Sequence, residues 1–128
     1  MSADQSAAAG SVLDLVNQNR ASAGLHALKL DASLCAAAQI RANEIVKSFS
    51  HTRPDGRKFS TVLTDNGIRF TAAGENIAWG QTSPSQVMNA WMNSDGHRAN
   101  IMNSTYTKLG VGHVTVNGRQ YWVQLFSY

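Results

Sequence analysis

The spacing of apolar residues along the chain predicts four helical segments and three extended ones. In four stretches, apolar side chains recur every three or four residues, and start or stop signals bound the stretches. These helical stretches run over 11–23, 32–49, 57–67 and 84–93. The last begins at Ser83-Pro84, where Ser83 caps the helix and Pro84 supplies the fixed geometry of a first turn. Extended segments are predicted over 69–80, 110–116 and 119–126.

The clearest strand signal is a hairpin at the end of the sequence. Its two segments flank Asn117-Gly118, the dipeptide most typical of a two-residue hairpin turn. This turn places His113 opposite Trp122. Large apolar residues occupy both faces of the second segment, so we expect a mainly antiparallel sheet with helices on each side. The fold class is therefore α+β, in a single domain.

Composition narrows the class of protein. The chain has 128 residues, of which 43% are hydrophobic and 15% charged, which suits one globular domain and excludes a disordered acidic chain. The net charge is only +3, so no nucleic-acid partner is expected. One basic cluster, RPDGRK at 53–58, could meet an anionic polymer. The single cysteine, Cys35, cannot form an intramolecular disulfide and is interpreted as a small buried apolar residue.

The location of the protein is left open by composition. No apolar run is long enough to span a bilayer, so no transmembrane segment is expected. The first ten residues lack the basic start and apolar core of a signal peptide. The protein is then either intracellular or exported by a signal that this sequence does not contain. We expect residues 1–10 to be poorly ordered and residues 11–128 to form the domain.

Two of the four histidines are candidates for a functional site. His26, in a connection, and His113, in the hairpin, are expected to have structural roles. His51 begins a Pro-Asp-Gly turn, and His97 follows Gly96 at a helix start. Both lie at loop edges, where binding and catalytic residues are common. The motifs HExxH and GxSxG and the P-loop are absent, so spacing alone names no reaction.

Five motifs in a fixed order resemble the CAP superfamily, which contains cysteine-rich secretory proteins, antigen 5 and pathogenesis-related proteins. The chain is similar in particular to the short bacterial, SCP-like branch. The motifs are LVNQNRASAGLHALKLDASLCAAAQIRA, FSHTRPDG, GENIAWG, AWMNSDGHRANIM and KLGVGHV…YWVQLF. The resemblance covers nearly the whole chain. It implies an α-β-α sandwich, in agreement with the two-faced sheet predicted above.

The resemblance also implies a cleft in which His51, Glu75 and His97 converge. Two imidazoles and one carboxylate suit Zn²⁺ or another borderline divalent ion, with one position left for water. The sequence therefore predicts a divalent-cation cofactor, zinc first. The alternative is that these polar groups only hydrogen-bond one another and position the loops.

Three further residues are expected near this cleft. Eukaryotic relatives carry a glutamate three residues after the helix tryptophan, whereas this chain has Ser94 there. The adjacent Asp95 could reach into the cleft in its place. Asn100 is expected to hold the loop that carries His51, without contacting the metal.

The resemblance permits several functions. We favour a secreted or surface-exposed monomer with a binding or recognition role over an enzyme, because no nucleophile or oxyanion hole can be named. The open alternatives are a metal-dependent hydrolase and a domain that binds a lipid, a sterol or a cell-surface polymer in the cleft. Apolar residues that could line a lipid groove are Phe70, Trp79, Met88, Met92 and Met102.

Overall fold

A computed structural model describes residues 3–128 of the chain, which form five helices and one four-stranded sheet. The helices are α1 (Ala3–Ser22), α2 (Ala32–Lys47), α3 (Thr61–Asp65), α4 (Pro84–Met92) and α5 (Asp95–Ile101). The strands are β1 (Lys29–Leu30), β2 (Ala73–Trp79), β3 (Lys108–Val116) and β4 (Arg119–Ser127). No helix within residues 3–128 combines the length and apolar character that crossing a membrane requires.

The strands lie in the order β1-β3-β4-β2. The hairpin β3–β4 turns at Asn117-Gly118, as predicted, and both residues have positive φ, 51° and 77°. Positive φ at both central residues is what a type I′ turn requires, and asparagine and glycine tolerate it best. His113 pairs with Trp122, in the predicted register. Strand β2 pairs antiparallel with β4, which places its central residue Asn76 opposite Gln124.

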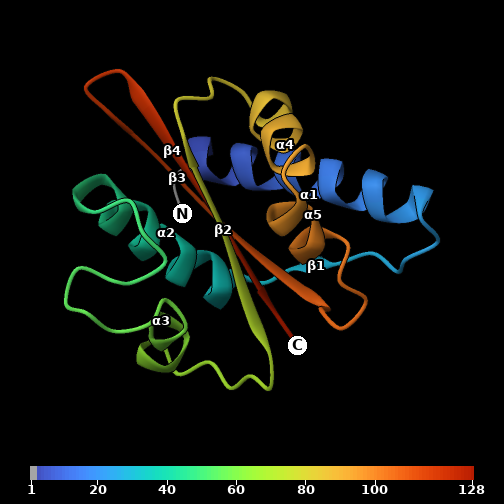
Figure 1. Cartoon of the computed structure of the whole chain (residues 1–128), viewed down its shortest axis with the longest axis horizontal. Helices are drawn as coiled ribbons and strands as arrows, with labels where there is room; N and C mark the ends of the chain where they lie inside the picture. Colours follow the sequence, from blue (N-terminus) through green and yellow to red (C-terminus); the bar gives the residue numbers. More distant parts are fainter. Residues whose placement is uncertain (1–2) are drawn as a thin grey trace.

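Helices cover both faces of the sheet, which confirms the predicted α-β-α sandwich. Figure 1 shows α1, α4 and α5 on one side of the strands and α2 and α3 on the other. Each layer has its own apolar core: Trp91, Trp122 and Phe126 lie in the first, and Leu34 and Leu125 in the second. Successive residues of β4 therefore enter opposite cores, because side chains alternate across a strand.

The structure differs from the sequence prediction at the ends of several helices and strands. Residues 3–10, expected to be poorly ordered, form the first turns of α1, and Ala9 is fully buried there; residues 1 and 2 lie outside the described part. Alanines favour helix but give little apolar periodicity, so pattern alone started this helix too late. Helix α2 ends at Lys47 rather than at 49. The sheet is mainly antiparallel, as predicted, although β1 pairs parallel with β3.

Candidate functional site

His51 lies on the loop between α2 and α3, with 57% of its side chain exposed. Its Nδ1 is 2.9 Å from Oε1 of Glu75, which projects from β2. An ionised carboxylate only accepts hydrogen bonds, so Nδ1 carries the proton and donates it. In the neutral ring, this contact selects the tautomer that leaves the lone pair on Nε2.

Glu75 is fully buried and is held by a buried arginine. Nε and Nη2 of Arg41, on α2, donate to the two Glu75 carboxylate oxygens at 2.6 and 3.0 Å. Burial alone would lower the pKa of Arg41, but its hydrogen bonds to Glu75 and Glu44 outweigh burial and raise it. Nη2 also donates to the backbone oxygen of Ser50 at 2.6 Å, directly before His51. Arg41 therefore fixes both the carboxylate and the loop that His51 contacts.

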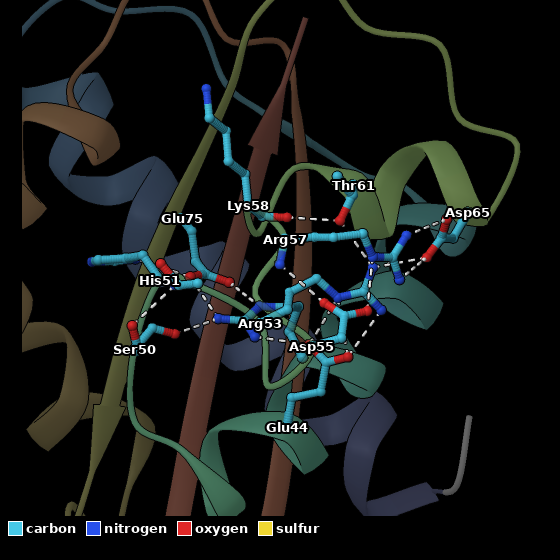
Figure 2. A network of polar contacts seen from close by, with 12 residues as sticks. Glu44, Ser50, His51, Arg53, Asp55, Arg57, Lys58, Thr61, Asp65 and Glu75 are labelled. Atoms are coloured by element: carbon cyan, nitrogen blue, oxygen red, sulfur yellow. Dashed lines mark hydrogen bonds and ion pairs between the residues drawn. The ribbon is translucent and has the colours of Figure 1, made fainter.

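Arg41 is also the second member of a chain of alternating charges that runs from Glu75 to the surface. Its members pair in the order Glu75, Arg41, Glu44, Arg53, Asp65, Arg57, Asp55. Figure 2 shows this network, with Glu75 and His51 at one end and Asp65 at the other. The two arginines of the basic RPDGRK loop are thus already paired with carboxylates. They do not form the free anion-binding surface that the sequence suggested.

His97 lies on α5, on the other side of β2 from α2. Its backbone oxygen accepts a hydrogen bond from Nδ2 of Asn76 at 3.1 Å, so the residue next to Glu75 holds it. Burial lowers the pKa of His97, and the charge of His51 lowers it further. The lowered pKa favours the neutral imidazole of His97 at pH 7. Its Nδ1 is buried and has no hydrogen-bond partner among residues 3–128.

The three neighbouring residues differ in how they meet this site. Ser94 takes the N-cap position of α5 but makes no side-chain cap bond. Asp95 does not reach in: its side chain is 95% exposed and accepts from Arg98 Nη2 at 2.8 Å. Asn100 is close but holds β2 rather than the His51 loop, because its Nδ2 donates to the Glu75 backbone oxygen and to Asn76 Oδ1.

The apolar residues proposed for a lipid groove are divided between the two faces of the sheet. Met88 is buried in the core beneath α1 and α4, and Met92 and Met102 pack against the same core. Phe70 packs against the opposite core. Trp79 is 46% exposed at the end of β2, with the Arg119 guanidinium carbon 4.3 Å from its ring centroid. The five side chains do not meet in one groove, and an apolar ligand stays a prediction.

The three side chains predicted to bind a metal do not form a three-ligand group. Within residues 3–128, no group of three or more His, Cys, Asp or Glu side chains is arranged to hold a metal ion. The Glu75 oxygens already accept three hydrogen bonds, from Arg41 and His51. A histidine that binds a metal through one ring nitrogen usually donates a hydrogen bond from the other nitrogen to a carboxylate, a backbone carbonyl or water, and that contact orients the ring. Glu75 fits that position, and the exposed His51 Nε2 fits that of a ligand.

Sequence reasoning missed the roles of Arg41 and Asn76. Arg41 falls on the otherwise apolar stripe of α2, beside Ala38 and Ile45, and a charge on a buried stripe requires a buried partner. That mismatch was the available signal. Asn76 joins two distant segments, because its Nδ2 donates to the backbone oxygen of His97 and to Oε1 of Gln124, the latter at 3.0 Å.

Comparisons with known proteins agree with this architecture. The chain is 38% identical over 117 residues to YkwD of Bacillus subtilis (strain 168), which covers 90% of this chain and 45% of YkwD. An extracellular SCP-domain protein from Bacillus anthracis superposes with a TM-score of 0.87 at 28% identity, over 95% of this chain and 40% of that one. NaASP2, solved with Zn²⁺, shares the fold at a TM-score of 0.70 and 16% identity, over 93% and 78% of the two chains.

The chain spans less than half the length of these two Bacillus proteins. The model of the cysteine-rich secretory protein family, CAP, matches residues 13–126. That match includes His51, His97, Glu75 and all of the four strands except Ser127, the last residue of β4. The chain therefore belongs to the CAP family.

Proposed function

We propose that this CAP domain acts by binding, and that His51 and His97 together hold a divalent ion such as zinc. The observation that carries the proposal is the hydrogen bond from Nδ1 of the exposed His51 side chain to Glu75, which orients the ring and leaves Nε2 as the nitrogen that can bind a metal ion. Neutral imidazole nitrogen is a preferred zinc ligand, and bound zinc would supply Lewis acidity and an open position for water or a ligand. Glu75 orients His51, and Asn76 holds the backbone of His97.

Charge balance supports a cation at this position. The chain of ion pairs from Glu75 to Asp55 contains four carboxylates and three guanidiniums, so one formal negative charge is left. His51 contacts the Glu75 end of that chain. A cation bound at His51 would offset the remaining charge. NaASP2, which shares this fold, has been solved with Zn²⁺, and this makes zinc the first ion to test.

We also propose that the domain works outside the cytoplasm, as the similar Bacillus anthracis protein does. The only cysteine, Cys35, is buried and unpaired, so this domain needs no oxidising compartment to fold. The proposal therefore depends on the relatives and not on a disulfide.

Calorimetric titration of the metal-free protein with ZnCl₂ tests the metal site. We expect saturable binding of one ion, and loss of that binding in His97→Ala and in His51→Ala. His113→Gln is the matched control, because it removes an imidazole whose hydrogen bond and ring contact are made to Gln120 and Trp122 within the β3–β4 hairpin. The proposal would be contradicted if the parent protein gave no heat of zinc binding, or if His97→Ala bound zinc as tightly as the parent.

Glu75→Gln separates an orienting carboxylate from a metal ligand. Because loss of an outer hydrogen-bond partner typically weakens metal binding about 10- to 100-fold, we expect zinc affinity to fall by that amount and not to vanish. Circular dichroism checks folding, since Arg41 loses its counter-charge. If a folded Glu75→Gln protein binds zinc like the parent, Glu75 does not orient the ligand.

A further inference from the structure

Two lysines that have no carboxylate partner within the described residues lie side by side at the β1 edge of the sheet. Lys29 on β1 lies directly beside Lys108 on β3 in the parallel ladder, so both side chains project from the same face. Both lysines are exposed, and within residues 3–128 neither ammonium group has a carboxylate within 4.0 Å. Like charges beside each other in a sheet repel, so the pair favours an anion between them.

A cavity of about 500 Å³ opens at these lysines. Its lining includes both ammonium-bearing side chains, His26, Thr107 and Asp31. The Asp31 carboxylate is engaged as the N-cap of α2, where its Oδ1 accepts from the Leu34 backbone N–H at 2.8 Å. The two lysines and one aspartate leave the lining with a net positive charge.

A buried arginine next to the cavity lining adds to this positive charge. Arg20 on α1 is fully buried and donates to the backbone oxygens of His26, Ile101 and Asn103 at 2.8, 2.9 and 2.8 Å, with no carboxylate among these partners. Burial lowers the pKa of Arg20, but an arginine stays charged at neutral pH. Its Nη2 is 3.4 Å from Nε2 of His26, a wall of the cavity. Solvent screens a buried charge less than an exposed one, so Arg20 makes the cavity more positive.

We propose that this cavity, which we name the β1 pocket, binds the phosphate group of a small anionic molecule through Lys29, Lys108 and Thr107. Lysines bind phosphate as point charges on flexible stems, whereas paired recognition of carboxylates favours arginine. The Thr107 hydroxyl adds a neutral donor. The cavity is larger than a phosphate ion, so the group is carried on an organic moiety. The pocket is separate from the histidine site, because β1 and β2 form opposite edges of the sheet.

Backbone amide NMR of the intact chain, titrated with inorganic phosphate at low ionic strength in EDTA, tests the β1 pocket. We expect saturable shifts at residues 29, 107 and 108, and tighter binding of glycerol 3-phosphate at the same amides. Lys29→Gln/Lys108→Gln should weaken binding at least about tenfold, the effect of losing roughly one charge-assisted hydrogen bond. Lys47→Gln/Lys58→Gln removes the same charge elsewhere and should change affinity less than about twofold.

Three results would overturn the proposal. Equal weakening by the two double variants would mean that phosphate only senses net charge. Acetate binding as tightly as phosphate would remove the phosphate preference. If the amide shifts of residues 29, 107 and 108 do not change, the pocket does not bind phosphate. The lysines would then be solvated charges that keep the β1 edge from pairing with other chains. The substituted lysines are exposed, so the variants are expected to fold, and thermal unfolding checks this directly.

Discussion

Gly110 and Gly112 allow α2 to lie directly on β3. Both face α2, and a Cβ at either position would collide with backbone: at Gly110 with the Leu34 carbonyl, and at Gly112 with that of Ala38. Neither residue has positive φ, so close approach and not turn geometry explains them. The close approach at Gly110 sets the position of α2 on the sheet, and Arg41 on α2 lies at the site as a result.

Gly112→Ala should destabilise the fold by roughly 3 kcal/mol, because α2 must shift to admit one methyl group against backbone atoms. Gly10→Ala is the matched control: no atom lies within 4 Å of its added Cβ, and alanine in the middle of a helix gains about 0.5–1 kcal/mol over glycine. Urea unfolding measures both. Similar stabilities for the two variants would show that the α2–β3 contact is not tight.

At the scale of elements, side chains cover the edges of the sheet. Strand β1 protects only the start of β3. Beyond β1, the side-chain amide of Gln39 makes two hydrogen bonds to the backbone of His113. Its Nε2 donates to the His113 oxygen and its Oε1 accepts from the His113 N–H, each at 3.0 Å. At the other edge, Trp91 Nε1 donates to the Ile77 backbone oxygen at 3.2 Å. Exposed edges invite pairing with other chains, so these contacts keep the domain from joining edge to edge.

Gln39→Ala should free the His113 backbone. We expect faster hydrogen exchange at the His113 amide and a loss of stability of about 1–3 kcal/mol, because a partly buried donor and acceptor lose their partner together. Gln18→Ala changes the same residue type on an exposed position of α1 and should leave this amide protected. Unchanged exchange at His113 in the Gln39 variant would mean that another group covers this edge.

At the scale of the whole molecule, the chain of ion pairs joins α2, the His51 loop, α3 and β2. Lowered pKa values shift three of its carboxylates, Glu44, Asp55 and Asp65, toward the ionised form. Burial alone would raise the pKa of Glu44, but hydrogen bonds from Arg53 and Arg41 outweigh it and hold the pKa below 4.5. Hydrogen bonds from Arg53 and Arg57 hold the pKa of Asp65 below 3.8. The site is thus tied to a surface loop whose position depends on these charges.

The domain should therefore lose stability in acid. The unfolded chain takes up protons on these carboxylates at higher pH than the folded one, so their contribution is complete above about pH 4.5 and is lost as the pH falls through the lowered folded values. Urea unfolding between about pH 3 and pH 7 measures this. Glu44→Gln should be less stable at pH 7 and show a smaller acid loss. A parent whose stability is level across this range would contradict the assignment.

The amino-acid sequence by itself determined the features that depend on a few neighbouring residues. Ser83-Pro84 specifies the start of α4, and Asn117-Gly118 specifies the β3–β4 turn and its register, because a cap and a type I′ turn are local backbone chemistry. The order of the motifs also indicated the family and the two histidines. These signals lie in the printed residues and need no knowledge of packing.

Only the tertiary structure decided which charges are neutralised and which remain free. Arg41 and Glu75 are 34 positions apart, and their buried pair depends on α2 and β2 meeting across the sheet. The same packing pairs the arginines of the basic loop and, among residues 3–128, leaves Lys29 beside Lys108 without a carboxylate partner. Electrostatic interactions depend on distance and burial, and segments far apart along a chain acquire both only when the layers assemble.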